Sequence, residues 1–469
     1  MKKLLVVAGA TVALIAAASM PQELSEEVLE YGAVQARGVA LTHVRVVDGT
    51  GAPAMEDQTI LIRDGLIARI DDADSVDLGA AIEVVELDGH TVIPGLVGLH
   101  DHSYYTTSRR AVQMSFTGPR LYLAAGVTTI RTTGSEYPYA EINLKKAIEA
   151  GEVPGPRMFV TGPYLTGDQG SMTMARLSDP EHARRVVSYW AEEGVDWFKA
   201  YTWISRDELA AAIDEAHKHG IKVTAHLCSV SFREAVEAGI DNIEHGLLTN
   251  SDYDETRSPD ACSRNLMQSV TELDLSSQQV KTTFREMVAA GVPMTTTPVV
   301  YEMFVKGRTE LDPRAREALA PGALEEVVAG AARIEESGSI APELFLKALQ
   351  YDYMFVESGG VLAAGVDPTG YGAALPGFGD QRNFELLLET DFTPVEAIRI
   401  VSANGAKVLG IYDEVGSVEV GKQADLVVLD GNPVANPRDI RNVKLVFKGG
   451  VGYDSAKLIE SVRGRVGIQ

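Results

Sequence analysis

The stretch TVIPGLVGLHDHSYY, residues 91–105, places two histidines two positions apart, at the end of an apolar run that a Pro-Gly pair interrupts. Alternate residues of a β-strand point the same way, so His100 and His102 would present both imidazoles to one point. This is the geometry of a metal chelate; a pair of hydrogen-bonded core histidines is the alternative. His217 and His219, in HKHG, are also two apart, but they end a predicted helix, where such side chains diverge. The first pair alone leaves both interpretations open, whereas the second pair is expected to be surface or C-capping groups.

Outward from this stretch, the middle of the chain repeats a unit of short apolar strand, polar loop and amphipathic helix. The helical segments 205–220 and 231–239 end at glycines, as helix C-termini commonly do. Eight strands are predicted here, at residues 92–100, 126–132, 157–163, 195–201, 221–227, 240–246, 292–298 and 361–367. Eight successive β-then-α units predict an α/β fold, the (β/α)8 TIM barrel, whose chemistry lies at the C-terminal ends of the strands.

Both ends of the chain have a different sequence pattern, in which apolar and polar residues alternate in short predicted strands joined at Asp-Gly turns. Such segments occur at residues 40–51, 57–71 and 416–431. Each piece alone would bury too little surface to fold. We therefore predict a small β-sandwich domain built from residues 36–93 and 412–469, beside a barrel of residues 94–411. Two separate β modules are the alternative.

Further side chains with metal-binding or catalytic chemistry stand at the ends of predicted strands. They are Lys199, His226, His245 and Asp367. Imidazoles together with a carboxylate suit zinc or another borderline divalent metal, and a catalytic site keeps one position open for water. Lys199 would either snorkel to solvent or, buried with a lowered pKa, take up carbon dioxide to form a carbamate that bridges two ions. The residues alone leave both roles open.

Several motifs, in order and at the expected strand ends, resemble the amidohydrolase superfamily. They are IPGLVGLHDH (93–102), FKAY (198–201), TAHL (224–227), NIEHG (242–246), AAGVD (363–367) and PVEAIRIVSANGAKVLGI (394–411). Within the superfamily the sequence is most similar to the prolidase-like, Xaa-carboxypeptidase-like and ochratoxin-hydrolysing branch. Two departures concern the substrate. Thr132 stands where many relatives carry an acidic residue, and GPYLTGDQG (162–170) replaces a loop usually rich in glycine and histidine.

The resemblance implies a site for two divalent metal ions, with zinc the expected one. The implied ligands are His100, His102, Lys199, His226, His245 and Asp367. The first two histidines and Asp367 would bind the more buried ion, and the other two histidines the second. A carbamate on Lys199 would bridge the ions, and Asp367 would also be the catalytic proton shuttle.

In such a site two cations lower the pKa of a bridging water, so that hydroxide forms at neutral pH and attacks a substrate carbonyl. Asp367 takes up the proton and passes it to the leaving amine. We therefore predict a hydrolase that cleaves amide bonds of dipeptides or N-acyl amino acids. A lactonase or cyclic-amide hydrolase of the same superfamily is the alternative. A deaminase is disfavoured, because Ser229 stands where such enzymes typically carry a glutamate, and a non-enzymatic protein would be expected to have lost ligands.

Aromatic residues in the loops after the strands are candidates for substrate binding. They are Tyr104, Tyr105, Tyr164, Tyr201 and Trp203. Tyr201 is preferred, because it lies two residues beyond Lys199 and would face the same side, where its phenol can bond a substrate carboxylate or oxyanion. Ordinary packing beneath a loop is the alternative.

Composition limits the class of protein. The chain has 469 residues, of which 45% are hydrophobic and 23% charged, as in a soluble globular protein with one barrel-sized domain and a smaller one. Its formal charge of −24 argues against a nucleic-acid or anionic-membrane partner. The expected partner is a small amide or dipeptide substrate, and a homo-oligomer is compatible with the sequence.

The first residues are typical of a secretion signal. Lys2 and Lys3 precede an apolar run, and Ala16 and Ala18 form an Ala-x-Ala cleavage pattern. We expect residues 1–19 to be a cleaved signal peptide, leaving a secreted or periplasmic protein with no stable membrane anchor. In such a compartment Cys228 and Cys262 form one disulfide or remain two buried thiols, and the sequence allows both.

Overall fold

A computed structural model describes residues 24–34, 37–75 and 82–468 of the chain. The predicted signal peptide, residues 1–19, lies outside these ranges. Within them, no helix is both long and apolar enough to cross a membrane.

Parallel strands form the interior of the larger part of the molecule. All eight predicted strands are present, as β7 (Leu96–Asp101), β10 (Val127–Thr132), β11 (Arg157–Val160), β14 (Trp197–Ala200), β15 (Lys222–Ala225), β16 (Asn242–Glu244), β17 (Met294–Thr296) and β18 (Leu362–Ala364). Every residue of β7, β10 and β14 is buried, as expected of parallel strands covered on both faces.

The pairing of these strands supports a TIM-barrel-type α/β fold, without one closed ring of ladders. β11, β10 and β7 form one parallel sheet, and β14 to β18 pair in chain order in a second. An isolated bridge between Thr161 and Trp197 joins the two sheets on one side. On the other side, the backbone N–H of Asp367 donates to His100 O at 2.7 Å. The predicted closed (β/α)8 barrel is thus borne out only in strand number, order and direction.

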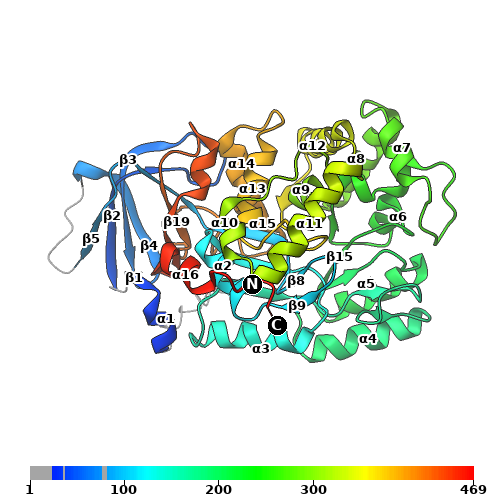
Figure 1. The fold of residues 1–469 in the computed structure, drawn as a ribbon, viewed down its shortest axis with the longest axis horizontal. Coiled ribbons are helices and arrows are strands. Elements are labelled where there is room, and N and C mark those ends of the chain that lie inside the picture. The colour runs from blue at the N-terminus through cyan, green and yellow to red at the C-terminus, as the bar shows by residue number, and fades with distance from the viewer. Residues whose placement is uncertain (1–23, 35–36, 76–81, 469) are drawn as a thin grey trace, which may run out of the picture.

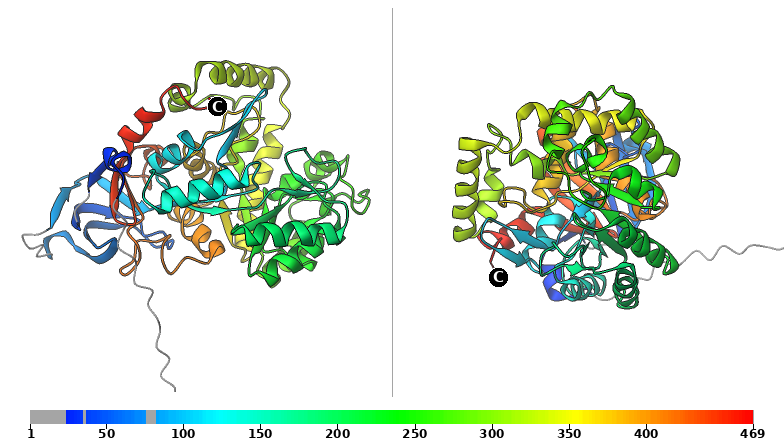
Figure 2. Two further views of the ribbon diagram at one scale, coloured as in Figure 1. Left: turned by 90° about the horizontal axis from the view of Figure 1, so that it is seen from below. Right: turned by 90° about the vertical axis from the view of Figure 1, so that its right-hand side faces the viewer.

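Helices alternate with the strands and cover them (Figures 1 and 2). They include α2 (Thr117–Ala124), α3 (Pro138–Glu149), α4 (Pro180–Glu192), α5 (Arg206–Lys218), α6 (Phe232–Glu237), α8 (Gln278–Ala290), α12 (Pro342–Glu357), α13 (Phe378–Leu387), α14 (Pro394–Val401) and α15 (Ala403–Leu409). Between β16 and α8 lies α7 (Leu266–Glu272), and α9 (Pro298–Glu302), α10 (Pro313–Ala318) and α11 (Pro321–Ser337) follow β17. Capping boxes begin α5 and α6, which fits the predicted starts at Ser205 and Ser231. His217 and His219 lie at the exposed end of α5, as expected.

A second sheet draws strands from both ends of the chain and lies at one end of the molecule (Figure 1). Its strands are β1 (Gly32–Val34), β2 (Gly38–Val46), β3 (Met55–Arg63), β4 (Leu66–Asp72), β5 (Glu83–Glu86), β6 (His90–Pro94), β19 (Leu426–Asp430), β20 (Val443–Lys448) and β21 (Val451–Asp454). They form one hydrogen-bonded sheet of nine strands, so the two packed sheets of the predicted β-sandwich are not confirmed.

The stretch that opens the sequence argument joins the two parts. The run 92–100, expected to be a single strand, divides at Gly95. The residues before it belong to β6, which pairs with β19, and those after it belong to β7. The first candidate ligand, His100, is therefore held six residues from the second sheet's β6. After β21, α16 (Ser455–Val462) packs against α2 through Leu458 and Leu123.

Candidate metal centre

The strand order brings all six predicted ligands to one region. His100 lies in β7 and Lys199 in β14. His102, His226 and His245 directly follow β7, β15 and β16, and Asp367 lies three residues beyond the end of β18. Five of them are buried, with exposed fractions between 1% and 9%, and His226 is half-buried. Burial of so many ionisable groups in one place requires that they be paired or bind a common ligand.

His100 lies at the centre of this cluster. Its Nε2 atom is 2.9 Å from Lys199 Nζ and 3.6 Å from Asp367 Oδ2. His102 Nε2 is 3.3 Å from Asp367 Oδ1, and the two imidazole rings are nearly perpendicular, with centroids 5.4 Å apart. Both histidines of the opening stretch thus converge on Asp367.

His226 and His245 complete the cluster on the other side. Their ring centroids are 4.3 Å apart, and His245 lies 4.5 Å from His100 by the same measure. The ligand atoms of His100, His245 and Asp367 all lie within 4.8 Å of one another. His100 and Asp367 were expected to bind one ion and His245 the other, so this compact group contains ligands of both expected subsites. Which ligand binds which ion stays a prediction.

The donor atoms fit a metal ion. His245 Nδ1 lies 2.8 Å from Thr297 Oγ1, whereas its Nε2 atom is buried and has no hydrogen-bond partner in the described chain. A buried imidazole nitrogen without a partner costs free energy unless something binds it. A metal-binding histidine usually has one ring nitrogen held by a hydrogen bond and the other free for the metal, and His245 has this arrangement.

Burial also sets the protonation states that metal ligands need. Burial, followed by the charge of Lys199, lowers the pKa of His226 to about 3, and burial lowers the pKa of Lys199 to about 8. Burial alone would raise the pKa of Asp367, but the neighbouring histidines and Lys199 hold it below its ordinary value. Burial lowers the pKa of the other three imidazoles as well. All four are therefore neutral, and the carboxylate is ionised, at neutral pH, as metal binding requires.

A carboxylate that the sequence analysis missed orients His100. Glu244 Oε2 lies 2.8 Å from His100 Nδ1, and Glu244 Oε1 accepts a hydrogen bond from Arg131 Nη2 at 2.5 Å. Both side chains of this ion pair are 0% exposed. Arg131 also donates from Nε to Leu99 O at 2.8 Å, so the pair ties the end of β10 to β7. In the sequence, the signal for this ion pair would have been an acidic and a basic residue inside strands that are expected to be fully buried.

Backbone conformation contributes to the same geometry. His245 and Asp367 have φ angles of 73° and 46°, in the left-handed region that non-glycine residues rarely adopt. Such strain persists where the surrounding structure imposes it, commonly at functional sites. At Gly365 a Cβ atom would lie 2.2 Å from the backbone nitrogen of His100, so only glycine lets β18 approach β7 this closely.

The expected substrate residue Tyr201 lies at the cluster. Its ring centroid is 4.9 Å from that of His226, and Lys199 Nζ lies 5.9 Å from it. Tyr164 packs edge-on against Tyr201, with centroids 5.0 Å apart. Tyr105 does not offer its hydroxyl hydrogen to a substrate, because the hydroxyl donates to Gly372 O at 2.6 Å.

The two cysteines, which the sequence left open, form a disulfide. Cys228 follows His226 by two residues and is bonded to Cys262, with the Cα atoms 4.9 Å apart. Cys262 lies in the segment between β16 and α7. The bridge therefore holds this segment beside the one that carries His226.

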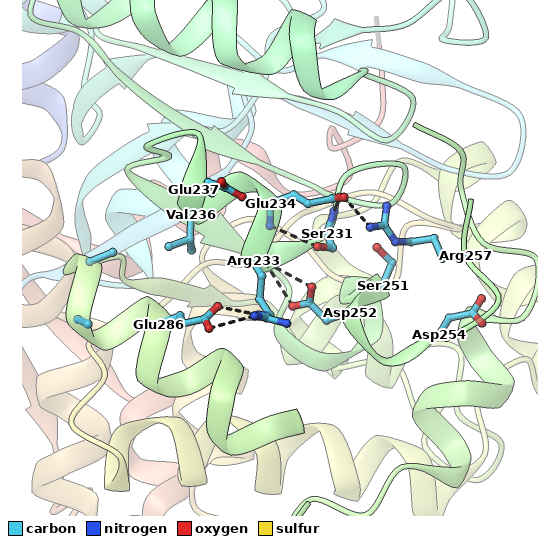
Figure 3. Close-up of a pocket in the computed structure, with 12 residues that line it drawn as sticks. Ser231, Arg233, Glu234, Val236, Glu237, Ser251, Asp252, Asp254, Arg257 and Glu286 are labelled. Atoms are coloured by element: carbon cyan, nitrogen blue, oxygen red, sulfur yellow. Dashed lines mark hydrogen bonds and ion pairs between the residues drawn. The ribbon is translucent and has the colours of Figure 1, made fainter. Parts of the chain in front are cut away.

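A separate pocket of about 870 Å³ lies among α6, α8 and the segment around Asp252, and it contains none of the six predicted ligands (Figure 3). Arg233 pairs there with Glu286 at 2.6 Å, and Arg257 pairs with Glu234 at 2.8 Å. Both arginines of the pocket are thus already paired with carboxylates, and we take the buried cluster as the candidate catalytic site.

Comparison with known proteins places the chain in context. The model of the Amidohydrolase family matches residues 91–452. An uncharacterized protein of Mycobacterium tuberculosis is 30% identical over 225 residues, which cover 45% of this chain and 56% of that protein. The chain therefore spans about half the length of the curated relatives that it matches first.

Solved structures resemble the chain over most of its length. The structure of a putative prolidase from Bifidobacterium longum has a TM-score of 0.63 and 24% identity, and the match covers 91% of this chain and 99% of that one. A Xaa-Pro dipeptidase with bound methionine in its active site has a TM-score of 0.66 and 20% identity, over 89% of this chain and 100% of that one. At these identities the likeness shows the fold.

Proposed function

Since the chain belongs to the amidohydrolase family, as the resemblance of its motifs predicted, we propose that it is a binuclear metal-dependent hydrolase that cleaves amide bonds of dipeptides or N-acyl amino acids. The observation that carries the proposal is the convergence of His100, His245 and Asp367, with ligand atoms within 4.8 Å of one another. Lys199 and the other two histidines lie beside this group.

The side chains would hold two divalent ions, with zinc favoured by the imidazole and carboxylate donors. Such ions, when bound, lower the pKa of water and polarise a carbonyl. Lys199, whose pKa burial lowers to about 8, would attack carbon dioxide through its neutral amine and lose a proton. The resulting carbamate offers two oxygen ligands in place of an ammonium that cannot bind a metal.

Asp367 would handle the proton. Its carboxylate lies 3.3 Å from His102 and 3.6 Å from His100, and the surrounding nitrogens keep it ionised. It would therefore accept a proton from the attacking water and deliver it to the leaving amine. Glu244 would keep His100 in the tautomer with Nε2 directed at the metal. Tyr201 would bond a substrate carboxylate.

The proposal includes a secreted or periplasmic location, which the predicted signal peptide supports. The Cys228–Cys262 disulfide supports that location, because disulfides persist mainly in oxidising compartments.

The test is elemental analysis of purified protein combined with hydrolysis of a library of dipeptides, N-acyl amino acids, lactones and cyclic amides, before and after chelation. We expect about two ions per chain and chelator-sensitive release of amines. His245→Ala should lose metal and activity, whereas His217→Ala, at a surface histidine paired with Asp241, should keep both. Turnover of lactones or cyclic amides without amide cleavage would favour the alternative, and a single ion per chain would remove the bridging role of Lys199.

A further inference from the structure

Two buried tyrosines at the candidate metal centre form a hydroxyl pair. Tyr104 begins β8 (Tyr104–Thr106), two residues after His102, and Tyr164 follows β11 in the loop that departs from the family pattern. The two hydroxyls are hydrogen-bonded to each other. The residues are 4% and 3% exposed, so solvent does not complete their hydrogen bonding.

The pair lies against residues of the reaction centre. The ring of Tyr104 stacks on that of His102, with centroids 4.5 Å apart. Lys199 Nζ lies 5.5 Å from the ring centroid of Tyr164, which also packs against Tyr201. The ring of Tyr164 therefore lies near both Lys199 and Tyr201, the residue expected to bind substrate.

A glycine in another loop makes room for Tyr164. Gly134 follows β10 and has a φ of +91°, and a Cβ atom there would lie 2.2 Å from Tyr164 Cε1. The rigid ring of Tyr164, which also packs against Tyr201, cannot move aside as the flexible end of a side chain could. The loop after β10 is thus shaped to hold this tyrosine at the site.

A count of hydroxyl hydrogens shows that one donor of the Tyr104–Tyr164 pair has no acceptor. Two phenols carry two hydrogens, and the bond between them uses one. In the described chain, neither hydroxyl has a second hydrogen-bond partner. A buried donor without an acceptor costs about 1–3 kcal/mol, so an oxygen of a bound ligand is the natural acceptor.

We propose that Tyr164, held in place by a hydrogen bond from the Tyr104 hydroxyl, donates to the oxygen of the scissile carbonyl as that oxygen becomes negatively charged. The proposal rests on the proposed hydrolytic function. As the attacking oxygen bonds to the carbonyl carbon, the C=O π pair moves onto the carbonyl oxygen, and the phenol proton stays on Tyr164 while stabilising that charge. Tyr164 is then a catalytic residue and Tyr104 a positioning residue.

The test compares Tyr164→Phe and Tyr104→Phe with a matched control. Tyr139 and Tyr189 form a second hydroxyl pair, on the surface between α3 and α4, and Tyr139→Phe removes one member of it. On the best substrate of the library, we expect kcat to fall about 10–100-fold in Tyr164→Phe and about 3–10-fold in Tyr104→Phe, with KM within about threefold of wild type. The control should keep the wild-type kcat.

A binding measurement gives a readout that does not depend on turnover. Methylphosphonate is a small tetrahedral anion, and calorimetry on zinc-loaded proteins of equal metal content gives its Kd. We expect Tyr164→Phe to weaken binding about tenfold or more and Tyr139→Phe to leave it unchanged. Should Tyr164→Phe fail to fold, Tyr104→Phe decides by the same two measurements.

The outcomes separate this proposal from the proposed function. A wild-type kcat and methylphosphonate Kd in Tyr164→Phe overturn the proposal, and so does a loss confined to KM, which would indicate a contact made equally in the ground state. If the wild type cleaves lactones but no amide, the amide function fails while the tyrosines are still tested on the lactone. If no substrate turns over, the methylphosphonate affinities decide.

Discussion

Glu244 contacts His100 at Nδ1, the ring nitrogen opposite the one that is proposed to bind metal. Its two oxygens contact His100 Nδ1 and Arg131 Nη2, and the Thr224 hydroxyl also donates to it. Such outer partners orient ligating imidazoles and raise their basicity. The arrangement also places an acid and a base in the strand core, where each requires the other.

Replacing Glu244 with glutamine tests this role. A glutamine side chain has one oxygen, so it cannot accept hydrogen bonds from His100 and Arg131 on separate oxygens as the carboxylate does. Arg131 also loses its counter-charge. We expect metal affinity to fall about 10–100-fold and the free energy of unfolding to fall by about 3 kcal/mol or more. Metal retained after dialysis against chelator, and urea denaturation, measure the two effects. Glu83→Gln, on the exposed β5, is the control, and equal metal retention in both variants would contradict the role of Glu244.

Glu141 predicts a pH dependence of stability that is independent of the metal ligands. It lies on α3 and is 0% exposed. Burial raises its pKa to about 8, against the hydroxyls of Thr132, Ser135 and Ser103, which lower it. In the unfolded chain a glutamate has its ordinary pKa near 4.3, so the unfolded state releases its proton first as the pH rises. The stability that the folded carboxyl contributes is therefore full below about pH 4 and is lost as the pH rises towards about 8.

Glu141→Gln should remove this loss. We expect the variant to be more stable than wild type by about 1–3 kcal/mol near pH 8, and by clearly less near pH 5. Urea unfolding at both pH values measures the difference. Glu149→Gln, at an exposed position of the same helix, should show no such dependence. A gain of the same size at both pH values would rule out the raised pKa as the cause.

At the scale of elements, burial explains what the sequence could predict. Strands such as β7, β10 and β14 are recognisable because parallel strands buried on both faces are nearly continuous apolar runs. The candidate ligands could be predicted as well, because they stand where those apolar runs end. Glu244 could not be placed in the same way, because alternation puts it on the opposite face from His245. The left-handed φ of 73° at His245 breaks that alternation, so both side chains reach His100.

Contact between β7 and β18 depends on the absence of one side chain. A Cβ atom at Gly365 would lie 2.2 Å from His100 N and 2.6 Å from His100 Cα, and backbone cannot yield as a flexible side chain can. We expect Gly365→Ala to destabilise the protein by about 2–4 kcal/mol and to lower its metal content, because Asp367 lies two residues beyond Gly365.

Gly322→Ala provides the matched control. Gly322 lies in the helix α11, and a Cβ atom there would approach only the end of the Arg110 side chain, at 3.3 Å. Its stability should change by no more than about 1 kcal/mol, in the direction of a gain. Thermal melting and elemental analysis of both variants decide, and a Gly365→Ala protein with wild-type melting and metal content would show that the strands can separate without harm.

At the scale of the whole molecule, alternation along the strands predicted that both chain ends contribute β-structure, but not how the strands pair. The strands are short and interrupted by turns, and their alternation reveals which face is buried but not which strand lies beside which. The pairing places β19 between β6 and β20, in one sheet instead of two. The consequence is that a strand from beyond residue 420 supports the segment that leads into the candidate metal centre.

Removal of residues 412–469 therefore tests whether that support is required. It deletes β19, which pairs with β6 up to Pro94, and the Asp425 carbonyl, which accepts a hydrogen bond from Gly95 N at 2.8 Å. The shortened chain keeps all six predicted ligands, yet β6 would keep only β2 as a partner and lose β19, which pairs with it as far as Pro94, just before β7. We expect it to be largely insoluble or to bind less zinc per chain than a control lacking only residues 1–19. Soluble expression with the control's zinc content would mean that the parallel-strand part folds alone, and that His100 needs no support from the second sheet.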